Sequence, residues 1–257
     1  MTDCFAFHEG DSPLLVSVPH DGRLLPDDIA AQMTEAGRAL PDTDWHVAKL
    51  YGFVKALGAS VIVANYSRYV VDLNRPDDDA ALYEGQAATG LCPRHTFDGR
   101  ELYCGEIAID IGDRLKRYWR PYHDQIHQTL TALRQRHGVA LLWDAHSIAS
   151  RMPALFEGEL PVLNIGTYDG LSCNDQRADV VLRVASDSPY STVMNGRFKG
   201  GYITRNYGDP QNNVHAIQLE LAQRSYMDEA SGAYDESAAS QLGDTLRRML
   251  AAFTMRA

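Results

Sequence analysis

The longest unbroken hydrophobic run in the central part of the chain ends abruptly in polar residues. Residues 139–143 are all apolar, and Asp144, His146 and Ser147 follow them closely. A continuous apolar run is typical of a strand that is buried on both faces of a sheet. Polar side chains at the carboxyl end of such a strand lie where α/β enzymes bind ligands. We therefore predict an inner strand at residues 139–148, with His146 in a functional site.

Two other predicted strands end in the same way. Residues 14–19 lead into His20, and residues 214–219 lead into Glu220. If all three strands belong to one sheet, two imidazoles and a carboxylate converge on one of its edges. This combination favours a metal-dependent hydrolase.

Helical and β-type patterns alternate along the rest of the chain. Helices are predicted at residues 26–36, 41–57, 106–118, 121–137, 175–185 and 234–253, and further strands at 60–66, 69–73 and 162–167. Pro121 fits the first turn of its helix, and Gly58 fits a helix C-cap. The alternation predicts a single three-layer α/β/α domain over residues 1–257, with a mostly parallel sheet. Two strand pairs with short connections suggest that the sheet is mixed.

One long segment carries neither pattern. Residues 77–104 are polar and irregular, and three glycines and one proline interrupt them. Loops of this length in a compact domain are usually functional. We expect this segment to form a flap over the site.

Composition narrows the class of protein. The chain has 257 residues, 45% of them hydrophobic, which suffices for a full core, and a formal charge of -10, which disfavours a nucleic-acid partner. Its four cysteines form no Cys-x-x-Cys pair, as expected for reduced thiols in the cytoplasm. The first residues lack the pattern of a signal peptide, and no segment reaches the ~18 apolar residues of a membrane span. We expect a cytoplasmic protein with a small substrate and no membrane partner.

A hydrolytic zinc site takes three protein ligands from His, Asp or Glu and leaves one position open. His20 and His146 are the best imidazole candidates, although a lone histidine is more often an ordinary core or surface residue. The third ligand stays open among Asp44, Asp42 and Asp21. Asp44 stands at a helix start, where an aspartate is commonly only an N-cap.

Two further carboxylates have candidate roles. Asp144 lies two residues before His146, on the same face of a strand, where it can orient the imidazole or else cap the next loop. Glu220 lies between two leucines, and burial there raises a carboxyl pKa toward the value that a general base needs. Its alternative role is an ion pair with Arg224. We favour the general base.

Arginines in predicted loops and strand ends suggest an acidic substrate, because a guanidinium binds a carboxylate through two parallel hydrogen bonds. Each arginine taken alone is equally compatible with a solvated surface position. The candidate substrate-binding residues are Arg68, Asn74, Arg75, Arg205, Asn206 and Tyr207.

A serine nucleophile is the main competing chemistry. Ser17, Ser67 and Ser147 each neighbour a histidine or an arginine, but none lies in Gly-x-Ser-x-Gly. Ser147 directly follows His146, which points the two side chains to opposite faces of an extended strand. The sequence therefore disfavours a serine triad.

Several motifs together carry a family resemblance. They are Ser-Val-Pro-His-Asp-Gly at 17–22, Asp-Thr-Asp-Trp-His at 42–46, Ser-Arg-Tyr-Val-Val-Asp-Leu-Asn-Arg-Pro at 67–76, Asp-Ala-His-Ser at 144–147 and Gly-Gly-Tyr-Ile-Thr-Arg-Asn-Tyr-Gly at 200–208. The run at 67–76 is the most specific. With them, the chain resembles the N-formylglutamate amidohydrolase family over nearly its whole length.

The resemblance implies a fold similar to that of the zinc carboxypeptidases. Their sites run along the chain as a His-x-x-Glu pair, an Asn-Arg pair, a lone His and a late Glu base. His20, Asn74 with Arg75, His146 and Glu220 repeat this order. One departure is that the third position after His20 holds an arginine and not a glutamate. The resemblance then implies that a carboxylate from elsewhere completes the ligand set, and we assign Asp44.

The activity implied by the resemblance is the hydrolysis of N-formyl-L-glutamate to formate and L-glutamate in histidine degradation. One divalent metal, zinc by preference, is expected on His20, Asp44 and His146, with the two imidazoles within about 6 Å of each other. Glu220 is expected to be the base. Asn74 and Arg75 are expected to bind one substrate carboxylate, and Arg68 or Arg205 the other.

Two other functions remain compatible with the sequence. One is a related zinc amidohydrolase that acts on another N-acyl acidic amino acid or a short peptide. The other is a non-catalytic module that binds carboxylates and leaves its metal site empty. The sequence does not indicate an oligomeric state.

Overall fold

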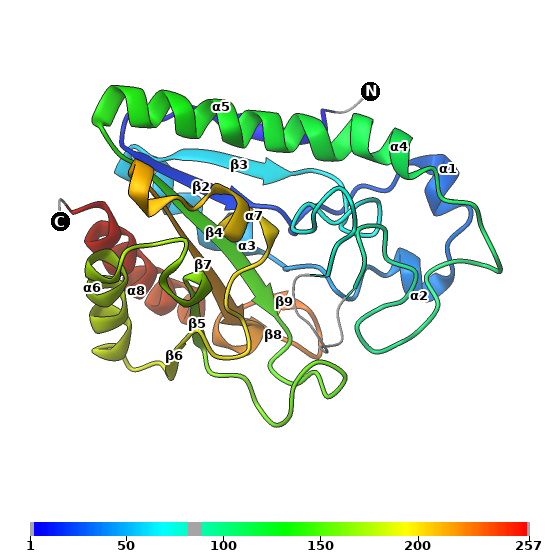
Figure 1. Ribbon diagram of the computed structural model, residues 1–257. Coiled ribbons are helices and arrows are strands. Elements are labelled where there is room, and N and C mark those ends of the chain that lie inside the picture. Colours follow the sequence, from blue (N-terminus) through cyan, green and yellow to red (C-terminus); the bar gives the residue numbers. More distant parts are fainter. Residues whose placement is uncertain (1–2, 82–88, 256–257) are drawn as a thin grey trace.

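A mixed seven-stranded sheet forms the centre of the molecule (Figure 1). The computed structural model describes residues 3–81 and 89–255, and within them the strand order is β1-β3-β2-β4-β7-β5-β6. The strands are β1 Phe5–His8, β2 Leu14–Val18, β3 Ser60–Ala64, β4 Ala140–Ile148, β5 Leu163–Gly166, β6 Thr192–Met194 and β7 Val214–Ala222. A separate two-stranded sheet pairs β8 Met227–Asp228 with β9 Ala233–Tyr234.

Helices cover the sheet on both sides (Figure 1). α4 and α5 run along one face, and α6 and α8 lie on the other. The α-helices are α1 Asp27–Ala30, α2 Glu35–Arg38, α3 Val47–Leu50, α4 Ile111–Arg114, α5 Arg120–His137, α6 Asp175–Ser186, α7 Tyr202–Tyr207 and α8 Glu236–Thr254. Shorter helical segments are Gly52–Leu57, Leu115–Trp119, Tyr168–Gly170, Pro210–Asn212 and Gln223–Ser225. Among these described helices, none is both long and apolar enough to cross a membrane.

The predicted α/β fold with a mixed, mostly parallel sheet is confirmed, but its antiparallel pairs are not the expected ones. β1 pairs antiparallel with β3, and β5 pairs antiparallel with β7. The strand predicted at residues 69–73 is wrong. That segment is a buried turn, in which Val70 N donates to Ser67 O and Asp72 N donates to Leu91 O. Its β-branched residues reflect burial and not membership of the sheet.

Several helix boundaries also differ from the prediction. The helix expected at 26–36 is two single turns, and the one expected at 41–57 is α3 followed by a 3₁₀ segment that Gly58 ends with φ 70°. The helix expected at 106–118 begins only at Ile111. α7 was not predicted, because it is short and lies in a segment rich in glycine and cations.

Pro121 lies in the first turn of α5, as predicted, although α5 continues directly from the helical segment before it. The π-helical turn Leu115–Trp119 joins α4 to α5 immediately before it. Proline lacks the amide that an α-helix would need here, and its ring would clash with the carbonyl four residues earlier. A π turn shifts the hydrogen-bond pattern by one residue, so the helix continues past the proline.

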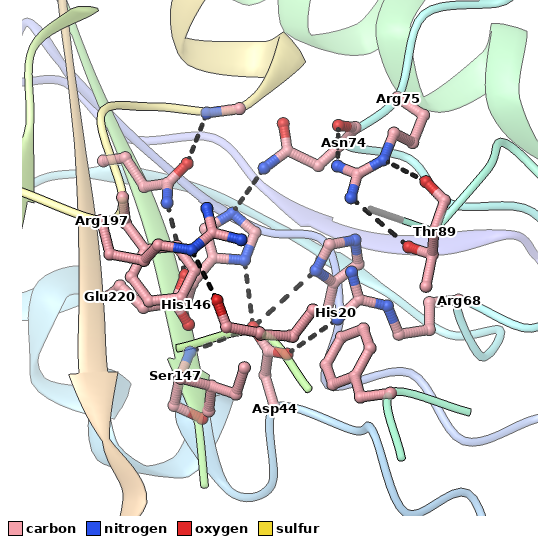
Figure 2. Close-up of a pocket in the computed structure, with 16 residues that line it drawn as sticks. His20, Asp44, Arg68, Asn74, Arg75, Thr89, His146, Ser147, Arg197 and Glu220 are labelled. Atoms are coloured by element: carbon pink, nitrogen blue, oxygen red, sulfur yellow. Dashed lines mark hydrogen bonds and ion pairs between the residues drawn. The ribbon is translucent and has the colours of Figure 1, made fainter. Parts of the chain in front are cut away.

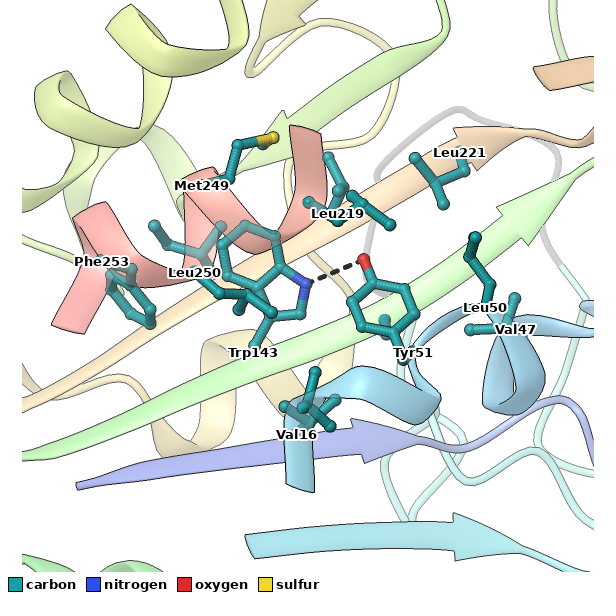
Figure 3. Packing of buried hydrophobic residues seen from close by; sticks show 14 of the residues in the cluster. Val16, Val47, Leu50, Tyr51, Trp143, Leu219, Leu221, Met249, Leu250 and Phe253 are labelled. Atoms are coloured by element: carbon teal, nitrogen blue, oxygen red, sulfur yellow. Dashed lines mark hydrogen bonds between the residues drawn. The ribbon is translucent and has the colours of Figure 1, made fainter. Parts of the chain in front are cut away.

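The alternation of side chains along the central strands produces two cores. On one face, Val16, Trp143 and Leu219 belong to a cluster that includes Phe253 of α8 (Figure 3). Trp143 Nε1 donates a hydrogen bond of 3.0 Å to Tyr51 Oη, so its polar atom is satisfied within this apolar layer. This face is hydrophobic along most of the length of the strands, with His215 on β7 and Ser147 on β4 as buried polar exceptions.

The opposite face changes character along the strands. Near their start, Leu15, Leu142 and Ala216 belong to a second core with Tyr122 and Ile126 of α5. Toward their carboxyl ends the same face carries Ser17, Asp144, His146, Gln218 and Glu220. These polar residues are all buried. The sheet therefore offers a desolvated polar surface at one end of a face that is otherwise apolar.

His123 of α5 fixes the backbone where this polar surface begins. Its imidazole is buried, stacks on Trp119 at 3.8 Å between ring centroids, and has Nδ1 2.9 Å from Tyr207 Oη. Nε2 lies 2.9 Å from Leu73 O, directly before Asn74. Burial lowers the pKa of His123 to about 4. The ring is therefore neutral in the folded protein at neutral pH.

The buried His123 should make stability depend on pH. Between pH 6.5 and 4 the unfolded chain binds a proton at this residue that the folded chain does not, so acidification lowers the free energy of unfolding by about 3 kcal/mol over this range. His123→Gln should remove that part of the slope. Urea titrations at several pH values measure it, with the exposed His137→Gln as control. Equal slopes for His123→Gln and the wild type would contradict the assignment.

Candidate active site

A cavity opens where the carboxyl ends of β2, β4 and β7 meet the loops that follow them (Figure 2). These three strands are neighbours and parallel, so their ends lie at one edge of the sheet. The described residues that line the cavity are His20, Asp44, Arg68, Asn74, Arg75, Thr89, Phe97, His146, Ser147, Ile148, Leu155, Arg197, Phe198, Gly201, Gln218 and Glu220.

The segment predicted as a flap contributes to this wall. Thr89 and Phe97 line the cavity, and the Phe97 ring lies 4.9 Å from the Arg68 guanidinium. Phe97 N also donates to Asp42 Oδ2 at 2.8 Å, which holds the segment against the site. Residues 82–88 of the predicted flap lie outside the described residues.

His20, Asp44 and His146 form a buried cluster that can hold a metal ion. One ligand atom from each lies within 4.8 Å of the others. Asp44 Oδ2 is 3.0 Å from His146 Nδ1 and 3.8 Å from His20 Nδ1, and the two imidazole centroids are 4.9 Å apart. The imidazoles therefore lie as close together as expected.

The backbone around Asp44 explains how a residue far from both histidines joins them. Asp44 N donates to His20 O at 3.1 Å, and Ser147 N donates to Asp44 Oδ2 at 3.1 Å. The two other aspartates considered for this position point elsewhere. Asp42 Oδ2 accepts from Tyr69 Oη at 2.6 Å, and Asp21 Oδ2 accepts from Ala48 N at 2.8 Å.

Each imidazole is held by a second carboxylate on its Nε2 atom. Asp72 Oδ1 lies 2.8 Å from His20 Nε2, and Asp144 Oδ2 lies 3.1 Å from His146 Nε2. Asn74 Nδ2 also lies 3.0 Å from His146 Nε2. Carboxylates in this position fix the ring orientation of a metal-binding histidine and raise its basicity. The expected contact between Asp144 and His146 is present.

Charges around the cluster shift the pKa values in opposite directions. Burial and the Arg68 charge lower the pKa of His20, although Asp72 opposes them. Burial alone would lower the pKa of His146, but the Asp144 and Asp44 carboxylates outweigh it and hold that pKa well above its usual value. Burial alone would raise the pKa of Asp44, but the hydrogen bond to His146 and the neighbouring positive charges lower it.

The donor atoms fit a divalent metal. A tetrahedral ion with bonds of about 2.1 Å needs donors roughly 3.4 Å apart, and the two Asp44 separations of 3.0 and 3.8 Å bracket this value. Within the described chain, His20 Nδ1 is buried without a hydrogen-bond partner. A buried polar atom of this kind is costly unless something binds it. Two imidazoles and one carboxylate are also a common donor set for catalytic zinc.

Glu220 lies beside the cluster because of the strand register. β4 and β7 pair in parallel, with His146 directly opposite Glu220. Gln218 Nε2 donates to Glu220 Oε2 at 3.3 Å, and Gln218 Oε1 accepts from Gly201 N at 2.7 Å. Gly201 must stay small, because a Cβ there would lie 2.3 Å from Asn74 Nδ2. Burial raises the pKa of Glu220 to about 8.

The candidate substrate-binding residues divide into two groups. Arg68, Asn74 and Arg75 line the cavity. Arg68 Nη2 pairs with Asp72 at 2.8 Å, and Arg75 Nε donates to Thr89 O at 2.8 Å.

The structure does not bring the other three candidates, Arg205, Asn206 and Tyr207, to the cavity. The Arg205 guanidinium lies 4.4 Å from the Tyr168 ring, and Tyr207 contacts His123. Asn206 is exposed. They lie on α7, a helix that the sequence pattern did not indicate.

Three residues of the site had no role assigned from the sequence. Asp72 lies in the most specific motif, two residues before Asn74. This position in the motif was the sequence signal that could have identified it as a residue of the site. Gln218 precedes Glu220 by two residues and shares its face of β7, which is a similar signal. Arg197 gave no local signal that separates it from the other cations of its segment.

Comparison with known proteins shows the family to which the chain belongs. The family model of N-formylglutamate amidohydrolase matches residues 12–227. The chain belongs to the N-formylglutamate amidohydrolase family. The resemblance seen in the sequence motifs is thereby confirmed.

Curated members of the family match nearly the whole chain. It is 49% identical to the N-formylglutamate deformylase of Pseudomonas putida over 258 residues, which cover 98% of this chain and 96% of the relative. The N-formylglutamate deformylase of Pseudomonas aeruginosa is also 49% identical, over 97% of this chain and 96% of its own length.

The fold is shared with solved structures. A crystal structure of N-formylglutamate amidohydrolase from Ralstonia eutropha JMP134 superposes with a TM-score of 0.84 at 24% identity, covering 98% of each chain. A structure from Agrobacterium tumefaciens has a TM-score of 0.72 at 17% identity, covering 97% of this chain and 96% of the other.

Asp72→Asn should weaken metal binding by about 10- to 100-fold, because the charge that orients and activates His20 is lost while the side-chain size is kept. Competition with a chromophoric chelator measures the affinity of the purified protein for Zn²⁺. Asp21→Asn is the matched control, since this buried carboxylate follows His20 in sequence but pairs with Arg23 and Ala48 N. An unchanged affinity in Asp72→Asn would show that Asp72 does not act through His20.

Proposed function

We propose that the chain, acting as one catalytic domain over residues 1–257, hydrolyses N-formyl-L-glutamate to formate and L-glutamate. The observation that carries the proposal is the placement of Glu220 directly opposite His146, beside a buried His20–Asp44–His146 cluster. Relatives named N-formylglutamate deformylase, 49% identical over nearly the whole chain, support this choice of substrate. Histidine degradation is the process in which such an activity is used.

His20, Asp44 and His146 are the proposed ligands of one divalent metal ion, by preference zinc. When bound, such an ion supplies positive charge that polarises the formyl carbonyl, acidifies water and favours the carboxylate form of Glu220. Asp72 and Asp144 hold the two imidazoles so that their Nδ1 atoms face Asp44.

Glu220 is the proposed general base and acid. Its carboxylate accepts a proton from the water that attacks the formyl carbon, and then delivers the proton to the amide nitrogen as the C–N bond breaks. The products are formate and the free amine of L-glutamate. Gln218 holds one carboxylate oxygen of Glu220 and so limits its rotation.

Asn74 and Arg75 are proposed to bind one carboxylate of the substrate. Both line the cavity, and the hydrogen bonds of Arg75 to Thr89 hold its guanidinium in place. Arg68 is paired with Asp72 and lies 3.6 Å from Asp44, so its charge offsets the acidic residues of the cluster. We propose that it also orients the formyl group.

Glu220→Gln should lower kcat by about 10²- to 10⁴-fold and leave KM and metal content close to wild type, because only proton transfer is lost. Steady-state kinetics with N-formyl-L-glutamate and metal analysis of the same preparation measure this. Glu9→Gln, at an exposed glutamate outside the cavity, controls for the amide substitution. Near wild-type turnover by Glu220→Gln would require another base.

The acyl specificity separates the proposed reaction from that of a related amidohydrolase. The metal-loaded protein should hydrolyse N-formyl-L-glutamate at least about 10-fold more efficiently than N-acetyl- or N-succinyl-L-glutamate, because each added group must fit beside Phe97 and Phe198 in the cavity wall. Release of free glutamate measures all three rates. A preference for the larger acyl groups would overturn the proposed substrate, and no turnover of any would favour a binding module.

A further inference from the structure

Arg197 lines the cavity from the segment between β6 and α7. In the view of Figure 2, the Arg197 side chain lies to the left of the cavity and Arg75 lies to the right. The segment contains another cation, Lys199, but that side chain pairs with Asp169 at 2.9 Å and is not part of the cavity wall. Position in the segment alone therefore does not explain why Arg197 reaches the site.

The Arg197 side chain is held in place at the cavity wall. Its Nε donates to Leu155 O at 2.9 Å, and its guanidinium carbon lies 5.5 Å from the centre of the Phe198 ring. Leu155 and Phe198 line the same cavity. A guanidinium fixed through Nε has its plane set in advance, so binding a carboxylate costs less side-chain entropy.

The described cavity wall contains two other arginines, and their surroundings differ. Arg68 is buried and paired with Asp72 and Asp44, so its charge is used within the metal-ligand cluster. Arg75 is held by Thr89 and by Asn74 O. The proposed substrate has two carboxylates, both on the amine side of the scissile C–N bond. With Arg75 on one of them, the other needs a cation at a different position in the cavity wall.

We propose that Arg197 binds the substrate carboxylate that Arg75 does not bind, and that it thereby sets the preference for a dicarboxylic substrate. Arg197 takes the place for which Arg205 was considered from the sequence, because Arg205 lies against Tyr168 and not at the cavity. This inference rests on the proposed function. It adds a specificity-determining residue to that reaction.

The test compares three substrates on each protein. N-formyl-L-glutamate carries both carboxylates, N-formyl-L-glutamine lacks the side-chain charge, and the α-amide of N-formyl-L-glutamate lacks the other charge. Arg197→Gln should lower kcat/KM for the dicarboxylate by about 100-fold, mainly through KM, because a carboxylate is left without its partner. The ratio of kcat/KM for the dicarboxylate to kcat/KM for an amide measures the preference for the missing charge. In Arg197→Gln this ratio should be at least about 10-fold lower than in the wild type for one of the two amides, namely the one that lacks the carboxylate bound by Arg197.

The ratios are independent of how much of the variant is folded, because both substrates meet the same active molecules. Lys199→Gln, which removes a neighbouring cation outside the cavity, should keep both wild-type ratios. Arg197→Lys should recover part of the lost ratio, since it restores charge but not the two parallel hydrogen bonds. Unchanged ratios in Arg197→Gln, or a loss of discrimination in Arg205→Gln instead, would overturn the inference.

Failure of the proposed function can be told apart from failure of this inference. If the wild-type protein hydrolyses none of the three compounds, the proposed reaction is wrong, and calorimetric binding of glutarate then decides the role of Arg197. Glutarate should bind the wild type about 10-fold more tightly than Arg197→Gln, because one ion pair is lost. Equal binding, or none to the wild type, would overturn the assignment.

Discussion

The site depends on pairs of buried carboxylates and imidazoles. Asp72 holds His20 and Asp144 holds His146, while Asp44 lies between the two rings. Burying several ionised carboxylates together is costly unless positive charge compensates them. Arg68 offsets part of this cost in the protein itself, and a divalent cation at the proposed ligands would offset more. The same charges that make the cluster costly to bury therefore suit it to hold a cation.

The sheet can carry this buried charged cluster because its two faces differ in polarity. One face of β2, β4 and β7 is mostly apolar and packs on α8, which anchors the strands. The other face is apolar only near the strand starts and polar near their ends. A register shift of one residue would move His146 and Glu220 to the opposite face of the sheet. The packing of Trp143 opposes such a shift, and it therefore also keeps these two side chains at the site.

The loops complete the site through contacts that connect distant parts of the chain. Gln218 links Glu220 to the backbone at Gly201, and Asn74 accepts from Ile203 N at 2.8 Å while its amide nitrogen lies against His146. The segment that carries Arg197 is thus tied both to the proposed base and to the Asn-Arg motif. The proposed substrate-binding and catalytic residues belong to one hydrogen-bonded network, so their relative positions are set before substrate enters.

The sequence alone determined the strands that lead to His20, His146 and Glu220, because mainly apolar runs followed by polar residues are a local pattern. It also determined the family, through motifs that lie within short stretches. Only the tertiary structure decided that Asp44 and not Asp42 or Asp21 joins the histidines, that residues 69–73 form a turn, and that Arg197 and not Arg205 reaches the cavity. These outcomes depend on the direction in which a loop side chain points and on contacts between residues far apart in the chain, and neither is encoded in the spacing of residue types.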